Sequence, residues 1–285
     1  DNAAGVDITL MSEARFSMVF EEINETLGRL SIVSVRDKDL ICPFNATLKN
    51  IDNPLISYTV NDHLKVPEFY NIPTGSYLLT LHVKDPPELA GLNRTYPPIT
   101  FPVCIMPGNI PGQAPQTCKV DAMDIFIGWS ASILAEFIFS ESTLNYTHDP
   151  AQKLISVHTT QKYPECPLYV SIVLPKNRMV KTLTAYSGSV SYNLNKLYNY
   201  TENIVGDHNI VAVRIPPEMD GLNCTYTVWG DFNGDGKCNL LDLVLVAIQF
   251  GKTVPPADAR YDLNSDGKIN LLDLVVTATH FGETV

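Results

Sequence analysis

Apolar and polar residues alternate over most of the first 228 positions, which is the pattern of strands that bury one face. The alternation begins with two short patches, at residues 6–10 and 16–20. These patches predict either the first strand of the domain that follows or an extended arm that adds a strand to the sheet of a neighbouring copy. Further runs of this kind lie at 153–160, 167–175 and 209–216.

Two changes in the pattern divide the chain. The stretch 104–119 is rich in proline and glycine, as linkers and loops are, and helical patterns replace strand patterns after Trp229. We therefore expect a mainly β protein with two β-sandwich domains followed by a small α-helical module. The expected divisions are an N-terminal extended arm or strand at 1–22, the first sandwich at 23–104, a linker at 105–119, the second sandwich at 120–228 and the helical module at 229–285.

Two segments of the β region resemble known modules. The run IPTGSYLLTLHV, at 72–83, resembles the Pro-x-Gly-x-Tyr hairpin of transthyretin-like or carboxypeptidase-regulatory-like sandwiches. The segment 133–157, followed by 166–175, is similar to modules of archaeal surface proteins. Both resemblances imply a sandwich fold, and the second also implies a place at the cell surface.

Composition limits the classes of partner. The 285 residues include 31 acidic and 20 basic side chains, which gives a formal net charge of −11. Binding to the phosphates of nucleic acid requires a basic surface, so we expect no nucleic acid partner. An acidic chain favours cationic ligands, above all divalent metals. Every apolar stretch is interrupted before about 18 residues, so we expect no membrane span.

The cysteines form an even set without a CxxC pair, which favours disulfide bonds in a secreted protein over zinc or redox motifs. They are Cys42, Cys104, Cys118, Cys166, Cys224 and Cys238. Short separations favour the pairs Cys104–Cys118 or Cys224–Cys238, and a bond from Cys238 to Cys224 or Cys166 would tie the helical module to the preceding domain. Buried free thiols in a reducing compartment are the alternative.

Asparagine points to the same compartment. Six Asn-X-Thr triplets without a central proline are candidate N-glycosylation sites, which carry glycans only in a secreted, glycosylating context. They begin at Asn24, Asn45, Asn93, Asn145, Asn199 and Asn223. The alternative is a β-rich composition, because asparagine is common in turns and threonine in strands.

The C-terminal region is an internal duplication. Residues 230–254 and 261–285 align at an offset of 31 with 16 identities in 25 positions. Each copy contains a twelve-residue loop, which we call loop 1 (231–242, DFNGDGKCNLLD) and loop 2 (262–273, DLNSDGKINLLD). A calcium-binding loop supplies oxygen ligands at positions one, three, five, seven, nine and twelve and turns sharply at a glycine in position six.

Both loops have this set complete. The expected ligands in loop 1 are Asp231, Asn233, Asp235, the carbonyl of Lys237, Asn239 and Asp242, and those in loop 2 are Asp262, Asn264, Asp266, the carbonyl of Lys268, Asn270 and Asp273. Charged, hard oxygen ligands suit calcium better than a transition metal. We therefore expect two Ca²⁺ ions, one in each loop.

Two loop-plus-helix repeats that end in Asp resemble a dockerin domain, over residues 230–285. The resemblance implies paired F-hand motifs around two structural calcium ions, and a cohesin-like partner. One feature departs from the family. Loop positions ten and eleven, which usually include small polar residues that contact cohesin, are Leu240-Leu241 and Leu271-Leu272 here.

The segments 240–250 and 271–281 are apolar around most of a helix circumference. Such helices need cover on more than one side, because large exposed apolar patches mark interfaces. We therefore expect the module to pack on the second sandwich or on another subunit. The alternative is that the two helices cover each other.

Motifs of catalysis are missing from the sequence: it contains no HExxH, GxSxG, phosphate-binding loop or dinucleotide fingerprint. We therefore expect no enzyme. We expect a secreted, N-glycosylated, calcium-stabilised structural protein of the cell surface that self-assembles into an extracellular filament or layer with copies of itself or a surface-layer protein. One alternative is a monomeric adhesion or carbohydrate-binding module that docks to a cohesin-like partner. Another is a non-catalytic fragment of a larger secreted hydrolase.

Overall fold

The computed structural model describes residues 13–24, 27–35, 44–61, 68–83, 98–105, 117–126, 144–159, 168–205, 207–216 and 219–285. The patch at 6–10 and the predicted sites Cys42, Asn93 and Cys166 lie outside the described residues. The described part includes the backbone, but not the side chains, of Asn24, Cys118 and Asn145.

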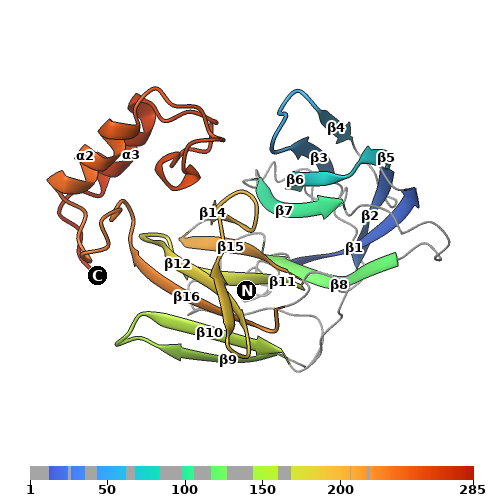
Figure 1. The fold of residues 1–285 in the computed structure, drawn as a ribbon, viewed down its shortest axis with the longest axis horizontal. Coiled ribbons are helices and arrows are strands. Elements are labelled where there is room, and N and C mark those ends of the chain that lie inside the picture. Colours follow the sequence, from blue (N-terminus) through green and yellow to red (C-terminus); the bar gives the residue numbers. More distant parts are fainter. Residues whose placement is uncertain are drawn as a thin grey trace, which may run out of the picture.

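The first sandwich consists of two antiparallel sheets of four strands (Figure 1). One sheet has the order β5-β2-β1-β8, from β1 (Glu13–Asn24), β2 (Leu27–Val35), β5 (Glu68–Pro73) and β8 (Thr117–Phe126). The other has the order β4-β3-β6-β7, from β3 (Phe44–Asn50), β4 (Ser57–Val60), β6 (Gly75–Val83) and β7 (Ile99–Ile105). Alternate residues of β6, namely Tyr77, Leu79 and Leu81, are buried, as a strand with one inward face requires.

Strand β1 contains the alternating patch at 16–20. It pairs with β2 on one side and with β8 on the other, so it is an inner strand of its own chain's sheet. Within this chain residues 13–24 form an inner strand of the first sandwich, and exchange of this strand with a neighbouring copy stays a prediction. Strand β8 crosses two predicted divisions, because it includes residues 117–119 of the expected linker and pairs residues 120–126 with the first sandwich.

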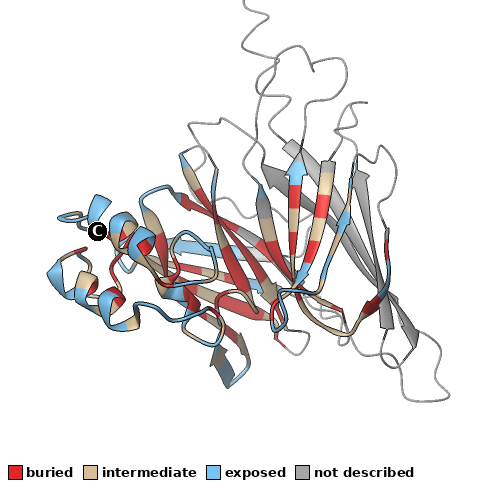
Figure 2. Cartoon of the chain, turned by 90° about the horizontal axis from the view of Figure 1, so that it is seen from above, coloured by how far each residue is buried: buried red, intermediate tan, exposed pale blue. Residues whose placement is uncertain are grey.

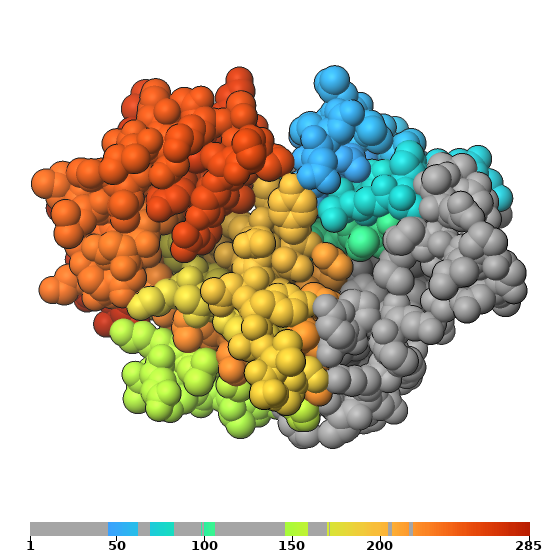
Figure 3. Space-filling view, in the orientation of Figure 1, coloured from blue at the N-terminus to red at the C-terminus, as the bar shows by residue number. Residues whose placement is uncertain are grey.

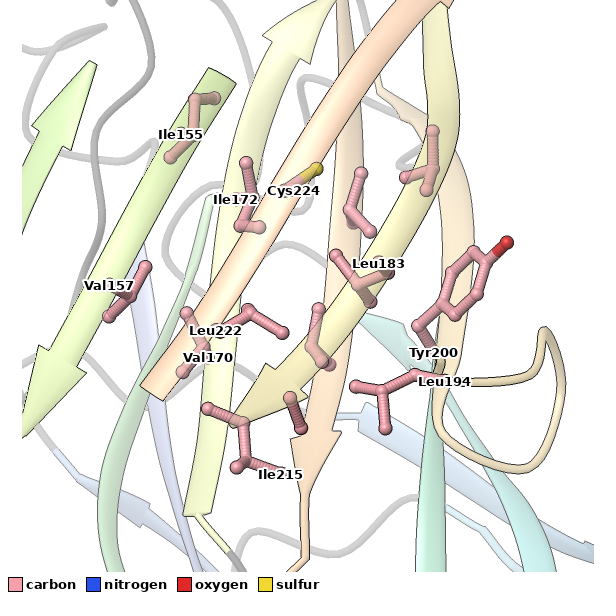
Figure 4. Packing of buried hydrophobic residues seen from close by; sticks show 14 of the residues in the cluster. Ile155, Val157, Val170, Ile172, Leu183, Leu194, Tyr200, Ile215, Leu222 and Cys224 are labelled. Carbon is pink, nitrogen blue, oxygen red and sulfur yellow. The ribbon is translucent and has the colours of Figure 1, made fainter. Parts of the chain in front are cut away.

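The second sandwich pairs a sheet of five strands with one of three. The first sheet has the order β13-β12-β16-β10-β9, from β9 (Leu144–Asp149), β10 (Leu154–Thr159), β12 (Arg178–Ser187), β13 (Val190–Asn193) and β16 (Gly221–Val228). The second has the order β11-β15-β14, from β11 (Leu168–Pro175), β14 (Tyr200–Val205) and β15 (His208–Ile215). Aliphatic side chains of both sheets interlock between them, among them Ile155, Ile172 and Leu222 (Figure 4).

Polar contacts join the two sandwiches where β7 meets β14. The side chain of Asn203 accepts a hydrogen bond from the Thr100 N–H at 2.8 Å and donates one to the Thr100 carbonyl at 3.1 Å. The Thr201 hydroxyl donates to the same carbonyl at 2.5 Å. Nearby, the Tyr198 hydroxyl donates to Asp52 Oδ1 at 2.7 Å. Since Asn203 and Thr201 are buried, these bonds hold the sandwiches in one relative orientation.

The C-terminal module, residues 229–285, contains α2 (Leu240–Gln249), the 3₁₀ helix η2 (Ala259–Tyr261) and α3 (Leu271–Thr279). It packs against the second sandwich (Figure 3). Each α-helix begins with a capping box, in which Asn239 or Asn270 exchanges hydrogen bonds with an aspartate three residues later. Within the described part of the chain, no helix is long and apolar enough to cross a membrane. The expected fold class, two sandwiches followed by a small helical module, is confirmed.

Of the predicted disulfide pairs, Cys224–Cys238 is wrong, because the three cysteines whose side chains are described, Cys104, Cys224 and Cys238, are free thiols. Cys224 is buried in the core of the second sandwich, where its neighbours are aliphatic (Figure 4). Cys238 lies in the C-terminal module, and its Sγ donates to the Thr277 carbonyl at 3.4 Å. The two sulfurs are therefore buried in different parts of the structure, although only 14 residues separate them in the sequence.

Native and denatured thiol labelling tests this correction. In the folded chain we expect Cys224 and Cys238 to resist iodoacetamide, because both are fully buried and burial raises the pKa of the Cys224 thiol. In guanidinium without a reductant both should react, as peptide mass spectrometry would show. If either cysteine reacts only after a reductant is added, it is in a disulfide and the correction fails.

Candidate metal centre

Loops 1 and 2 lie in equivalent places in the two repeats, each directly before an α-helix (Figure 1). Loop 1 starts at Asp231, after the last strand of the second sandwich, and loop 2 starts at Asp262, after η2. Gly236 and Gly267 occupy position six with φ of +85° and +87°, the left-handed region that favours glycine. The sharp turn that the spacing predicts is therefore present in both loops.

In loop 1 two buried carboxylates organise the backbone. Asp231, 3% exposed, accepts from the N–H groups of Gly234 at 2.7 Å, Asp235 at 3.1 Å and Gly236 at 2.8 Å. Asp242, 0% exposed, accepts from those of Phe232 at 2.8 Å, Asn233 at 3.0 Å and Asn239 at 2.8 Å. The first and last residues of the loop thus hold its backbone in a closed ring.

Loop 2 repeats this arrangement with Asp262 and Asp273. Asp262 accepts from the N–H groups at positions 266 and 267, at 3.1 and 3.0 Å. Asp273 accepts from those at 263, 264 and 270, at 2.7, 3.3 and 2.7 Å. One difference concerns position four, where Gly234 of loop 1 has φ +76° and Ser265 of loop 2 has φ +58°. A left-handed conformation is more strained for serine than for glycine.

The exposed carboxylate at position five is bridged by two carboxamides in each loop. In loop 1, Asn233 and Asn239 both donate to Asp235 Oδ2, each at 3.1 Å. In loop 2, Asn264 and Asn270 donate to Asp266 Oδ2 at 3.0 and 2.8 Å. The side chains at positions three, five and nine are therefore brought together, as the ligand pattern predicts.

Lys237 and Lys268, at position seven of each loop, make their contacts through the backbone and not through the side chain. Their side chains are exposed, whereas their backbones form single β-bridges, Lys237 to Thr284 and Lys268 to Thr253. In this way the segment that follows α2 pairs with loop 2, and the segment that follows α3 pairs with loop 1. The two repeats consequently close on each other.

The charge of the loops is suited to a cation. Among the described residues, the four buried aspartates have no ion pair with a basic side chain. Burial raises the pKa of the Asp262 carboxyl, and the neighbouring Asp273 charge raises it further, against the opposing hydrogen bond from Gly267 and the charge of Lys196. Within the described part of the chain, no group of three or more Asp, Glu, His or Cys residues is arranged so that it could hold a metal ion by itself. The fit rests instead on the mixed set of carboxylate, carboxamide and carbonyl oxygens, which is the set that calcium prefers.

Large apolar residues in and just after both α-helices are exposed, and we call the surface that they form the apolar helix face. Exposed residues of the helices are pale blue in Figure 2. The apolar helix face consists of Leu240, Leu241, Val244, Ile248 and Phe250 from the first repeat and Leu271, Leu272, Val275 and Phe281 from the second. Neither the second sandwich nor the other helix covers these residues, so for them the remaining expected cover, another subunit, stays a prediction. Leu240 and Leu271, for example, are 65% and 64% exposed.

The opposite side of the module packs on the second sandwich. Its buried core contains Val246, Val254, Ala259 and Ile269, and Leu197 from the turn before β14 is packed against this core. Leu197 has a positive φ of 74°, which is rare for leucine and is held by the surrounding contacts. Sequence analysis missed Leu197, because a single leucine in a polar turn carries no pattern.

The described glycosylation candidates lie in the sandwiches. Asn45, in β3, pairs with His82 of β6, and Asn223, in β16, lies between Ser156 and Thr184 of its neighbours. Asn199 lies in the turn before β14, where its side chain accepts from the Asn195 N–H at 3.1 Å. Each of these three asparagines is partly exposed. None of them is in the C-terminal module.

Comparison with known proteins agrees with the geometry of the C-terminal module. The family model of the dockerin type I domain matches residues 229–279. No curated protein and no solved structure matches the chain. Dockerin domains are non-catalytic docking modules that in general bind calcium, pair with a cohesin-type partner and occur typically in extracellular proteins. The module at the C-terminus of this mainly β chain is thus similar to a type I dockerin.

Proposed function

We propose that the chain is a non-catalytic modular protein that docks, through its calcium-loaded dockerin module, to a cohesin-like partner. The observation that carries the proposal is the apolar helix face, which lies on a module matched to the dockerin family and is built twice. Residues at the same offset of 31, such as Leu240 and Leu271 or Leu241 and Leu272, are exposed in both repeats. Large exposed apolar surfaces mark sites of protein association.

Two calcium ions would support this face. In each loop the oxygens of the aspartates at positions one, five and twelve, the asparagines at three and nine and the carbonyl at seven would hold one ion. The residue at position twelve, Asp242 or Asp273, is also the third residue of the helix that follows and belongs to its capping box. A bound ion would therefore hold the aspartate of the capping box in place at the start of each helix whose exposed side forms the face.

The chemistry of the face constrains the partner. Leucine occupies loop positions ten and eleven in both repeats, at exposures between 54% and 65%. The docking surface of the partner should accordingly be apolar at its centre and polar only at its rim. A cohesin-like module with a polar centre would leave these leucines against unpaired polar groups and would bind weakly.

Secretion and N-glycosylation remain part of the proposal. Dockerin modules are typical of extracellular proteins, and Asn45, Asn199 and Asn223 are partly exposed in a part of the chain separate from the apolar helix face. Glycans at these positions would therefore leave that face free. The support for secretion rests on these two observations and not on disulfide bonds.

Self-assembly and carbohydrate binding are the two alternative functions. A second copy could cover the apolar helix face, which would give the self-assembling filament or layer subunit that the sequence suggests. Binding of carbohydrate by a flat aromatic platform has less support, because the two exposed tyrosines among the described residues, Tyr70 and Tyr146, lie in different sandwiches. We place docking to a cohesin-like partner first and self-assembly as the alternative occupant.

Calcium titration tests the metal site. Isothermal titration calorimetry of the chelator-treated chain should give two ions per chain. Asp235→Ala and Asp266→Ala each remove the exposed position-five ligand of one loop, so each variant should bind one ion. Calcium should raise the thermal midpoint, since free calcium at 100 times the dissociation constant stabilises by about 2.7 kcal/mol per site. The control Asp207→Ala, an exposed turn acid of the second sandwich, should still bind two ions. Absence of binding in the unaltered chain would refute the metal site.

A charge placed on the apolar helix face tests docking. We expect Leu240→Glu with Leu271→Glu to change stability by no more than about 0.5 kcal/mol, because both side chains are exposed. The pair should abolish binding to cohesin modules from the same genome in surface plasmon resonance, whereas Val190→Glu, an exposed site on β13, should not. Retained binding in the double variant would contradict the proposal. A homopolymer that light scattering detects and the double variant dissolves would assign the face to a second copy instead.

A further inference from the structure

Loop 1 is connected to the second sandwich without a linker. Only Trp229 and Gly230, both buried, lie between the end of β16 and the first residue of the loop. The Trp229 N–H donates to the Asn177 carbonyl at 3.1 Å, and the Gly230 N–H donates to Met179 Sδ at 3.1 Å. Asn177 directly precedes β12, and Met179 is the second residue of that strand. The chain that enters loop 1 is therefore fixed to the sheet of the sandwich.

A sandwich side chain also reaches the first expected ligand of loop 1. Thr227, the penultimate residue of β16, is 2% exposed, and its hydroxyl donates to Asp231 Oδ2. The same carboxylate oxygen accepts from the Gly236 N–H at 2.8 Å. A threonine outside the segment that matches the dockerin family thus orients the carboxylate at position one.

A second contact comes from Lys181 in β12. The register between β12 and β16 shifts between Val180 and Thr182, so Lys181 is the extra residue of a β-bulge. Its ammonium donates to the Gly234 carbonyl of loop 1 at 2.7 Å. Bulges redirect side chains out of the regular alternation, and here the redirected side chain spans the gap to the loop. A Cβ at Gly234 would lie 2.9 Å from Lys181 Cε, so a side chain there would displace the lysine from its present position.

Loop 2 has no hydrogen bond of this kind within the described part of the chain. The counterpart of Thr227 at the offset of 31 is Asp258, whose carboxylate accepts from Arg260 Nε and Nη2 at 2.9 and 2.7 Å. The hydrogen-bond donors to Asp262 are the backbone N–H groups of loop 2 itself. The ammonium of Lys196 acts on Asp262 as a charge at longer range, while it pairs with Glu202 at 3.5 Å. The two loops therefore differ in the donors to the aspartate at position one: a sandwich side chain donates to Asp231, whereas Asp262, among the described residues, accepts only from its own loop.

We propose that Thr227 is a positioning residue for calcium in loop 1, and that Thr227 and Lys181 make loop 1 and the second sandwich one cooperative unit. This inference rests on the proposed binding of calcium. The two sites are then unequal. Calcium in loop 1 stabilises the ends of β12 and β16, whereas calcium in loop 2 stabilises only the dockerin module. The dockerin module is then a built-in part of the sandwich and not a tethered one.

The affinity test uses the full chain with calcium as the ligand. Thr227→Val keeps the shape of the side chain and removes the donor, and we expect it to weaken one of the two sites about tenfold, as the loss of a residue that orients a ligand does. The other site should be unchanged, and Thr227→Ser should restore the affinity. Thr184→Val is the matched control, because the Thr184 hydroxyl donates to Asn193 Oδ1, at 3.0 Å, away from the loops.

Hydrogen exchange at saturating calcium provides a second test that does not depend on the Thr227 variants folding. In the unaltered chain, calcium should slow exchange in the peptides that contain 177–182 and 225–230. Lys181→Met alters an exposed side chain, and should reduce the calcium-dependent protection of 177–182 at least twofold while loop 2 stays protected.

The outcomes separate this inference from the proposed function. If the unaltered chain binds no calcium, both fail. If it binds two ions but Thr227→Val leaves both constants unchanged, or shifts both equally, only the inference fails. It also fails if calcium leaves the exchange of 177–182 and 225–230 unchanged in the unaltered chain.

Discussion

The burial of four aspartate carboxylates is the constraint on which the C-terminal module depends. Asp231, Asp242, Asp262 and Asp273 are at most 4% exposed, and burial of a charge costs several kcal/mol unless hydrogen bonds or a counter-charge offset it. Backbone N–H groups from the loops supply the hydrogen bonds. A divalent cation in each loop would supply the counter-charge, and the same carboxylates would then link the metal to the first turn of each helix.

This constraint connects the sheets to the apolar helix face. The second sandwich ends in β16, β16 leads within two residues into loop 1, and loop 1 leads into α2. Leu197 packs into the core of the module, and Asn203 joins the second sandwich to the first. A partner bound to the apolar helix face would therefore hold both sandwiches in a defined orientation relative to itself.

The sequence predicts the local features of this molecule well and the long-range ones poorly. Alternation over 16–20 predicts β1, and the repeat at an offset of 31 predicts both loops, because each feature is written in neighbouring residues. The state of Cys224 and Cys238 depends on which core each sulfur faces, which only strand register and module packing decide. The exposure of Leu240 and Leu271 depends on which side of the module meets the sandwich. Lys181 lies 53 residues before Gly234, whose carbonyl it contacts, and Thr227 lies in a strand that precedes the loop pattern, so neither local periodicity nor the duplication predicts these two contacts.

A crystal structure of the full chain grown with calcium, with an anomalous difference map, tests the central claim most directly. The account predicts two peaks, one in each loop, surrounded by oxygens at about 2.3–2.6 Å, with Thr227 in contact with the carboxylate that binds the first ion. Loops that keep their closed backbone but contain no anomalous peak would contradict it.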